Sequence, residues 1–223
     1  NGTDALTISL LSLNLKPGSE VIMPAMTYAS TFYSILNAQL KPVLVDINSN
    51  DPLINFNEIK KKMTNKTKVI MPVHLYGSVV DLKKLRSIIK KKSIYIVDDC
   101  AQAHGAFLLN GTRVGGGSYA DISSFSLYPG KNLGAYGDAG IITTNSPLLS
   151  KRISSIRNIG ALKKFNHFTI GLNSRLDTIQ AAILSHKIIN LDTLNKKRSL
   201  IAKKYFLGIK NDKIKFIDYT KKA

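Results

Sequence analysis

Residues 93–99 read Ser-Ile-Tyr-Ile-Val-Asp-Asp. A short, unbroken apolar run of this kind predicts a strand that is buried on both faces, as in a parallel sheet. The run ends in two adjacent carboxylates, Asp98 and Asp99. Ligands of open α/β sheets bind beyond the carboxyl ends of the strands. We therefore expect a functional site at the carboxyl end of this strand.

Short apolar segments alternate with amphipathic ones on both sides of this stretch. The pattern predicts strands at residues 20–24, 42–45, 68–72, 122–124 and 140–144, and a further strand beginning at 215–219. Helices are predicted at 3–14, 27–38, 55–63, 81–91 and 147–157, followed by one long helix over 176–209. Strands that alternate with helices build βαβ units. We therefore expect an α/β fold of three layers, αβα, around a mainly parallel sheet.

The predicted long helix ends near residue 209, and the residues behind it are too few for a second domain. We expect residues 1–208 to form one large domain and residues 209–223 to begin a small C-terminal domain. Because the chain starts without a methionine, inside an expected helix, the expectation is a fragment of that large domain, truncated at both ends.

The composition narrows the class of protein. The chain has 32 basic and 14 acidic residues, a net charge of +18, which by itself is typical of nucleic-acid binders. Only six of the basic residues are arginine, the side chain that base-edge recognition favours. We expect a solvated lysine-rich surface that helps to attract an anionic substrate, and no nucleic-acid partner. No apolar run is long enough to predict a membrane span, and the single cysteine, Cys100, suits a reducing, cytoplasmic location.

Two segments have the residue types that chemistry needs. A glycine-rich stretch, 124–140, holds Lys131 between two strands, and a partly desolvated lysine on such a loop can act as a Schiff-base nucleophile. Taken alone the pattern is ambiguous, because a glycine-rich loop with a surface lysine is the commoner case. Asp98 and Asp99 could pair with a protonated ring nitrogen or merely end the strand. A metal site built from these carboxylates with Cys100 and His104 lacks a recognised ligand spacing, so no metal is expected.

The first residues of the chain also suggest a ligand. Gly2, Thr3 and Asp4 open the first expected helix. Free N–H groups and the helix dipole at such an end favour a phosphate. Taken alone, a Gly-Thr cap is a common way to start a helix. The run Gly115-Gly116-Gly117 has no following Lys-Ser/Thr and is interpreted as a turn.

In combination, these segments resemble the DegT/DnrJ/StrS sugar aminotransferases, pyridoxal-phosphate (PLP) enzymes of the aspartate-aminotransferase fold type. The resemblance runs from residue 1 to about 208 and rests on five motifs in register, at residues 1–6, 24–31, 98–106, 126–140 and 171–182. Phenylalanine, threonine and alanine are frequent in the family where this chain has Leu127, Gly130 and Asp4; none of these departures removes a catalytic group.

The resemblance implies a role for each matching residue. Lys131 is expected to form the Schiff base with PLP and to move the proton between cofactor and substrate carbons. Asp99 is expected to pair with the pyridine nitrogen, Gln102 to lie near the phenolic oxygen, and Tyr28 to stack on the ring. The remaining cofactor contacts are expected from Gly2, Thr3 and Asp4 through their N–H groups, from Ser126 through its hydroxyl, and from Asn173 of the neighbouring subunit of a homodimer with shared active sites.

Four further residues are candidates for the substrate side. They are His104, Tyr128, Tyr136 and His167, which flank the motifs. Packing or solvation explains each of them equally well.

The function that the resemblance implies is transfer of an amino group from glutamate to a keto sugar on a nucleoside diphosphate, with 3-keto-6-deoxy sugars as the best-matching subgroup. The product would enter glycan, lipopolysaccharide or secondary-metabolite synthesis. Two alternatives stay open: another PLP reaction on the same scaffold, such as dehydration, and a non-catalytic PLP-binding regulator. Lys131 favours transamination, because sugar dehydratases of this group have histidine at the lysine position.

Overall fold

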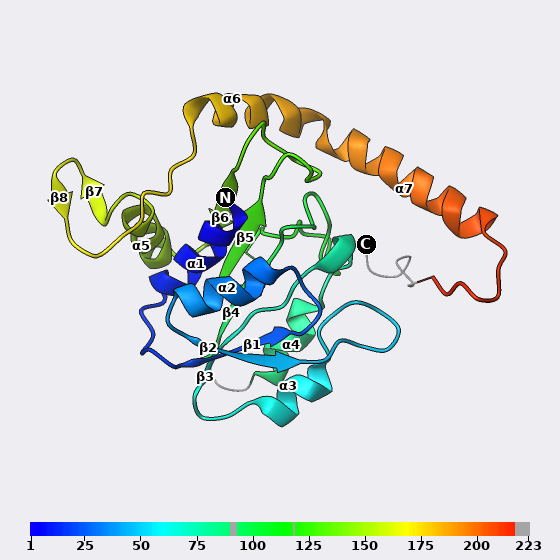
Figure 1. Cartoon of the computed structure of the whole chain (residues 1–223), viewed down its shortest axis with the longest axis horizontal. Coiled ribbons are helices and arrows are strands. Elements are labelled where there is room, and N and C mark those ends of the chain that lie inside the picture. The colour runs from blue at the N-terminus through cyan, green and yellow to red at the C-terminus, as the bar shows by residue number, and fades with distance from the viewer. Residues whose placement is uncertain (90–92, 118, 217–223) are drawn as a thin grey trace.

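A central six-stranded sheet organises the molecule. The computed structural model describes residues 1–89, 93–117 and 119–216 (Figure 1). The strands are β1 (Glu20–Pro24), β2 (Lys41–Val45), β3 (Thr67–Ile70), β4 (Tyr95–Asp99), β5 (Ile122–Ser126) and β6 (Gly140–Thr143), in the order β2-β1-β3-β4-β5-β6. All neighbours pair in parallel except β5 and β6. The mainly parallel sheet is therefore confirmed.

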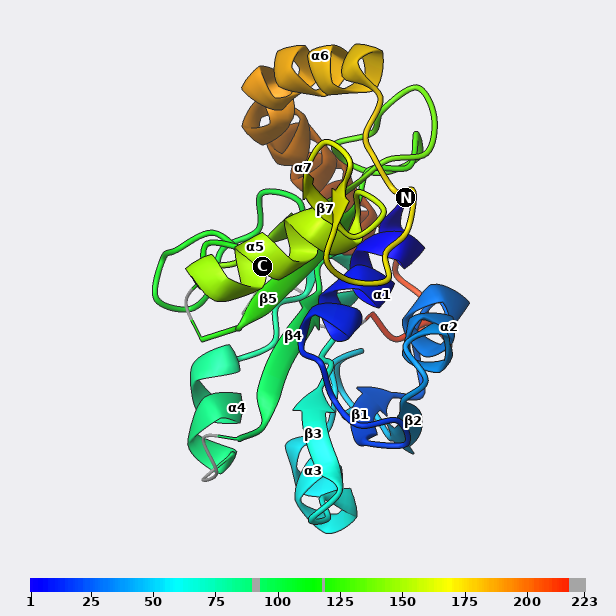
Figure 2. The same cartoon turned by 90° about the vertical axis from the view of Figure 1, so that its left-hand side faces the viewer.

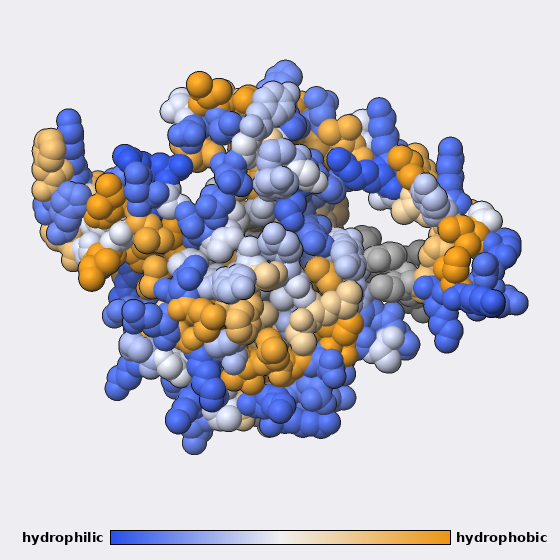
Figure 3. Space-filling model, in the orientation of Figure 1, coloured by the Kyte–Doolittle hydropathy of each residue, from blue (hydrophilic) through white to orange (hydrophobic). Residues whose placement is uncertain are grey.

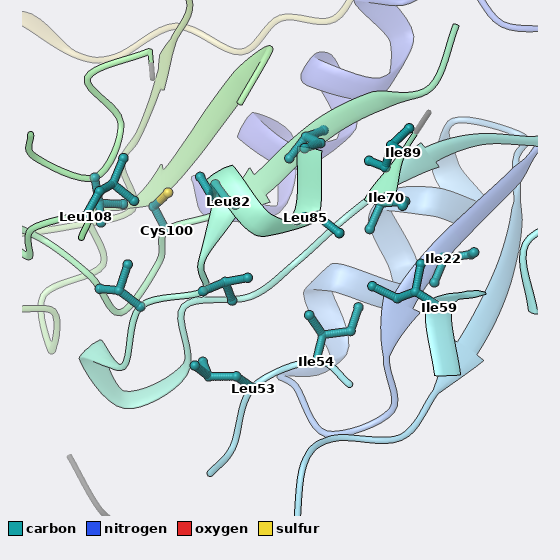
Figure 4. Close-up of a cluster of buried hydrophobic side chains, with 14 of the residues drawn as sticks. Ile22, Leu53, Ile54, Ile59, Ile70, Leu82, Leu85, Ile89, Cys100 and Leu108 are labelled. Carbon is teal, nitrogen blue, oxygen red and sulfur yellow. The ribbon is translucent and has the colours of Figure 1, made fainter. Parts of the chain in front are cut away.

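Helices cover both faces of this sheet, as Figure 2 shows. The helices α1 (Gly2–Ser12), α2 (Ala29–Asn37) and α5 (Pro147–Ile156) lie on one face, and α3 (Phe56–Lys62) and α4 (Leu82–Ile88) on the other. Each face has its own apolar cluster. Ile59, Leu82 and Leu85 pack on the second face (Figure 4), and Leu6, Ile35 and Ile153 pack on the first. The expected αβα layers are thus confirmed.

Side-chain caps explain where several helices begin. The Asn1 side chain accepts the Asp4 N–H at 2.8 Å and starts α1, and the Asp81 side chain accepts the Lys84 N–H at 2.9 Å and starts α4. Ser146 caps α5, which has Pro147 in its first turn. Each cap satisfies an N–H group that has no partner inside the helix. These residue types are visible in the sequence, so most of the expected helix starts lie within two residues of the observed ones.

The expected single helix over 176–209 is wrong. The chain forms α6 (Thr178–Lys187), a 3₁₀ turn (Ile188–Asn190) and α7 (Leu191–Gly208). The β-branched Ile188 and Ile189 and the following asparagine favour the α-helix weakly, and the tighter turn accompanies burial of Leu184 and Leu191 in one cluster. The apolar spacing alone did not separate the two helices.

Other boundaries also differ from expectation. The chain contains an unpredicted hairpin of β7 (Ala161–Lys163) and β8 (Asn166–His167), strands too short to show an alternating pattern. In the strand expected at 215–219, residues 215 and 216 form no strand, and the rest of it lies outside the described residues. The helix expected over 81–91 ends at Ile88, and its positions 90 and 91 also lie outside them.

The last elements project from the sheet. The hairpin extends to one side in Figure 1, while α6 and α7 run along the top of the molecule. No helix among the described residues has the length and apolar character that crossing a membrane requires.

Candidate functional site

One cavity collects most of the residues that the sequence singled out. It has a volume of about 620 Å³ and lies at the carboxyl ends of β1, β4 and β5, beside the N-terminus of α1. The predicted residues that line it are Gly2, Thr3, Asp4, Tyr28, Asp99, Gln102, Ser126, Tyr128 and Lys131. A second cavity, of about 640 Å³ between β6 and α5, contains none of them. The first cavity is therefore the candidate site.

Asp99 forms the buried wall of this cavity. Its side chain is held on both oxygens, because Oδ1 accepts the Ala101 N–H at 3.0 Å and Oδ2 accepts the Thr31 hydroxyl at 2.8 Å. Burial raises the pKa of the Asp99 carboxyl, while these two hydrogen bonds and the charge of Lys131 act in the opposite direction. The result is a fixed and comparatively basic carboxylate, suited to hold a proton on a ring nitrogen.

Asp98 points to the opposite side of β4. Its Oδ2 lies 3.1 Å from His74 Nε2, and both side chains are buried. His74 Nδ1 accepts the Val80 N–H at 3.0 Å, so Nδ1 has no proton and Nε2 is the donor to Asp98. The pair ties β4 to the chain segment that follows β3, which also holds Asp99 in place, since the His74 N–H donates to the Asp99 carbonyl.

These hydrogen bonds also bear on a metal. His74, Asp98 and Cys100 could bring ligand atoms within 4.8 Å of one another. However, the Nε2 that faces Asp98 already bears the ring proton, and burial raises the pKa of the Cys100 thiol well above its usual value. A metal ligand needs a deprotonated ring nitrogen and a thiolate. The cluster therefore fits a structural hydrogen-bonded pair better than a metal centre.

Gln102 is oriented by the backbone of a tight turn. Its Oε1 accepts the Tyr76 N–H at 2.6 Å, and Tyr76 has a left-handed φ of 56°. Because Oε1 is occupied, the side-chain NH₂ is the group left to point into the cavity as a donor. A donor at this position suits an anionic or phenolic oxygen of a ligand.

Lys131 lies on a folded loop opposite Asp99. The Lys131 N–H donates to the Tyr128 carbonyl at 2.9 Å, and the Ala135 N–H donates to the Leu127 carbonyl at 2.8 Å. The loop folds back so closely that a Cβ on Gly134 would lie 2.4 Å from the Pro129 carbonyl oxygen. Lys131 thus lies on a loop with its own backbone hydrogen bonds, and its side chain lines the same cavity as the buried carboxylate.

The N-terminus of α1 forms the polar end of the cavity. A Cβ on Gly2 would lie 2.6 Å from Ser126 Cβ, so only glycine permits the helix to approach β5 this closely. The Asp4 N–H is bonded to the Asn1 side chain, which leaves the N–H groups of Gly2 and Thr3 for a ligand. Asp4 instead uses its carboxylate to accept the Ser174 hydroxyl at 2.8 Å. Two N–H groups and the Ser126 hydroxyl therefore remain as donors for an anion.

Four predicted residues do not line the cavity. His104 is only 5% exposed, its Nε2 donates to the Ser126 carbonyl at 2.8 Å, and burial lowers its pKa to about 4. Tyr136 donates its N–H to Gln180 on α6, and His167 lies on the exposed hairpin. Asn173 pairs with Asn158 beside that hairpin and accepts two hydrogen bonds from Arg175. In this chain, Tyr128 is thus the one substrate-side candidate that reaches the cavity.

The sequence reasoning missed residues that shape the site indirectly. Thr31 holds Asp99, Thr27 bonds to Thr31 at 2.8 Å, and Ser30 accepts the Thr3 hydroxyl at 2.7 Å. These hydroxyls occur at the start of α2, directly after β1. The signal that could have identified them is this cluster of Thr and Ser at the carboxyl end of a parallel strand, where ligands bind.

Comparison with known proteins identifies the same family that the sequence motifs resemble. Residues 1–221 match the model of the DegT/DnrJ/EryC1/StrS aminotransferase family. The chain is 46% identical to a dTDP-3-amino-3,6-dideoxy-alpha-D-galactopyranose transaminase of Aneurinibacillus thermoaerophilus, over 95% of this chain and 57% of that protein. The chain spans about half the length of the curated relatives that it matches.

Solved structures resemble the fold over nearly the whole chain. A structure of Streptomyces venezuelae DesV in complex with a ketimine intermediate has a TM-score of 0.89 at 40% identity, covering 93% of this chain and 55% of that one. A structure of NtdA from Bacillus subtilis with bound cofactor PMP has a TM-score of 0.84 at 36% identity, covering 92% and 46%.

Proposed function

Because the chain belongs to the DegT/DnrJ/EryC1/StrS aminotransferase family, we propose that it forms the cofactor-binding part of a PLP-dependent sugar aminotransferase. The proposed reaction moves an amino group from glutamate to a keto sugar linked to a nucleoside diphosphate. One observation carries the proposal: Lys131 and the buried Asp99 line one cavity whose polar end is the N-terminus of α1. Residues 1–208 are proposed as the large domain and 209–223 as the start of a small one.

The residues of the cavity fit the chemical groups of PLP. The N–H groups of Gly2 and Thr3 and the Ser126 hydroxyl suit its phosphate. Asp99 suits the pyridine nitrogen, the Gln102 amide suits the phenolic oxygen, and the exposed ring of Tyr28 is available to stack. The close packing of Gly2 against Ser126 supports this fit, because a side chain on residue 2 would clash with the Ser126 donor.

Each residue has a task in the proposed reaction. Bound PLP supplies the electron sink that stabilises a carbanion at the reacting carbon. Asp99 holds the proton on the pyridine nitrogen, and its raised pKa strengthens that hold. Lys131 would hold the cofactor through Nζ, and the same Nζ would be the group that moves a proton between carbon atoms. Gln102 and Tyr28 keep the ring in one orientation.

The substrate proposal rests on the family and on the charge. A relative at 46% identity is named for a dTDP-linked 3-amino-3,6-dideoxy sugar, which supports a sugar nucleotide with a keto group at C3. The net charge of +18 favours approach of a diphosphate. Tyr128 lines the cavity next to Lys131 and is proposed to contact the sugar. Product use in glycan, lipopolysaccharide or secondary-metabolite synthesis, in the cytoplasm, follows from the same proposal.

A homodimer with shared active sites is part of the proposal. Asn173 lies outside the cavity of its own chain, and its Nδ2 has no hydrogen-bond partner among the described residues. Donation from this Nδ2 to the cofactor phosphate of a second subunit would explain both facts. The exposed hairpin beside it has the apolar character of a contact surface: Phe165 is 86% exposed and Phe168 68% exposed.

The test is an absorption spectrum of the PLP-loaded protein before and after addition of glutamate, with the Lys131→Ala variant as comparison. We expect a visible band that glutamate converts to a shorter-wavelength form, and neither change in Lys131→Ala. Mass spectrometry of the sugar nucleotide then distinguishes the reactions, since transamination adds nitrogen and dehydration removes water. A band that ignores glutamate and all sugar nucleotides would favour a PLP-binding regulator.

A further inference from the structure

We propose that Asn195 of α7 is a positioning residue that sets Lys131 against Asp99. The proposal rests on the proposed function and adds a residue that does not line the cavity. Asn195 bridges the two chain segments on which the Schiff-base lysine and the ring-binding carboxylate lie. One segment is the loop 128–138, which holds Lys131, and the other is the segment 99–105, which holds Asp99 and Gln102.

Both side-chain groups of Asn195 are engaged, one on each segment. Its Nδ2 donates to the His104 carbonyl at 2.8 Å, and its Oδ1 accepts from Asn132 Nδ2, also at 2.8 Å. A carbonyl oxygen can only accept, so the amide has a single orientation that satisfies both bonds. Asn132 directly follows Lys131 in the chain. The half-buried Asn195 amide therefore fixes the spacing between the lysine loop and the segment behind Asp99.

The segment opposite the loop is shaped to receive Asn195. Gly105 has a φ of 81°, and a Cβ at this position would lie 2.9 Å from Asn195 Nδ2. Any other residue at position 105 would displace the amide. Next to it, Arg113 donates to the Gly105 carbonyl at 2.9 Å and pairs with Asp192 on α7. The start of α7 is thus anchored to the 99–105 segment independently of the lysine loop.

Two further bonds join the lysine loop to α6. Lys187 Nζ donates to the Gly134 carbonyl at 2.5 Å, and Gln180 Oε1 accepts the Tyr136 N–H at 2.8 Å. Leu127, Leu133 and Ala135 of the loop region pack with Leu184 and Leu191. These contacts hold the outer part of the loop on the helices. Asn195 differs from them because it alone among these groups reaches both the residue after Lys131 and the segment that contains Asp99 and Gln102.

The closing experiment compares Asn195→Ala with two other variants. Asn132→Ala removes only the bond to the loop. Ser199→Ala is the matched control, because Ser199 lies one turn further along α7, is exposed and has no hydrogen-bond partner among the described residues. Alanine favours the helix more than asparagine does, so a loss in Asn195→Ala cannot come from a weaker α7.

Two measurements are made on each variant. Hydrogen exchange of the peptide 127–137 without PLP reads the order of the loop, and visible circular dichroism with PLP reads the orientation of the bound cofactor. We expect exchange about fivefold faster in Asn195→Ala and Asn132→Ala, a smaller visible signal in both, and no change in Ser199→Ala. The double variant should match Asn195→Ala, because Asn195→Ala already removes the one bond that Asn132→Ala removes.

Unchanged exchange and an unchanged visible signal in Asn132→Ala would overturn the proposal, as would equal changes in Ser199→Ala. If Asn195→Ala fails to fold, Asn132→Ala decides alone. Failure of the proposed function looks different: wild-type protein would form no Lys131-dependent band with PLP, whereas the exchange measurement, made without PLP, would still report whether Asn195 holds the loop.

Discussion

His104 is a buried base held in its neutral form, which makes the folded protein less stable in acid. Its Nε2–H donates to the Ser126 carbonyl, so the ring locks the Asp99 segment to β5. Burial is the main cause that lowers its pKa, and the nearby Lys131 charge adds to it; together they bring it to about 4. In the unfolded chain the same ring binds a proton near pH 6.5. Acid therefore favours the unfolded state.

We expect the free energy of unfolding to be highest above pH 6.5 and to fall as the pH drops toward 4. The shift corresponds to a loss of at most about 3 kcal/mol. In His104→Gln, whose side chain never charges, the slope between pH 6.5 and 4 should be markedly smaller. Denaturant unfolding at several pH values checks this. His167→Gln, a change on the exposed hairpin, is the control, and an equal slope in wild type and His104→Gln would contradict the prediction.

The proposed ring-binding residue Asp99 is a buried carboxylate, which stability alone would disfavour. Burying a carboxylate is unfavourable, and the raised pKa of Asp99 expresses that penalty. Ala101 and Thr31 offset part of it with one hydrogen bond to each oxygen. Asp99 and Lys131 could be named from the sequence because their motifs are local. Thr31 belongs to a cluster of hydroxyl residues after β1 that marks a ligand-binding edge, but its bond to Asp99 depends on how α2 packs, which the sequence does not contain.

At the level of elements, the contact between α1 and β5 builds the end of the cavity that we propose to bind the cofactor phosphate. The two elements are more than a hundred residues apart in the chain, yet the Ser9 and Ser124 hydroxyls lie 2.9 Å apart and Gly2 packs directly on Ser126. Glycine is required at this point for its lack of a side chain, since a Cβ would fall 2.6 Å from Ser126 Cβ.

We expect Gly2→Ala to displace the start of α1 and to destabilise the protein by about 1–3 kcal/mol, the usual cost of overpacking. PLP affinity should fall as well, because the N–H groups and the Ser126 hydroxyl would no longer converge. Thermal unfolding and a PLP titration measure the two effects. Gly208→Ala is the control, since a Cβ there meets nothing within 4 Å and should leave both quantities nearly unchanged. Normal PLP affinity in Gly2→Ala would contradict the expectation.

Some elements could be predicted from the sequence, and others could not. Strands β1, β3 and β4 are apolar runs between clear turn signals, and each lies within two residues of its expected bounds. The hairpin β7–β8 has no such signal, because its strands have two or three residues and lie on the surface. The break between α6 and α7 accompanies packing of Leu184 and Leu191 with residues of the lysine loop, a tertiary contact that spacing along the chain does not contain.

At the level of the whole molecule, the outer surface is not uniformly polar. Figure 3 shows hydrophobic residues among hydrophilic ones at both ends of the molecule. On the hairpin side these include Phe165, Phe168 and Ile170, and on α7 Leu200, Ile201 and Leu207. Exposed apolar groups in such number are typical of surfaces that contact another protein or another part of the same protein. The hairpin group lies next to Asn173, which the proposed dimer places at the site of the second subunit.

This arrangement predicts complementation between inactive subunits. In a dimer of one Lys131→Ala and one Asn173→Ala subunit, one active site has both changes and the other has neither, provided that Asn173 acts across the interface. Each variant alone should have low transaminase activity. Random pairing of co-expressed subunits makes half of the dimers mixed, so activity should recover to about a quarter of the wild-type value.

The control replaces Asn173→Ala with Asp99→Ala. Lys131 and Asp99 line the same cavity of one chain, so every site in that mixed dimer has one of the two changes and activity should stay absent. Recovery in the first mixture and not in the second requires a shared site, because stabilisation of one subunit by the other would affect both mixtures alike. If the first mixture gives only the mean of its two variants, Asn173 acts within its own chain, or not at the cofactor, and the exposed hairpin must serve another contact.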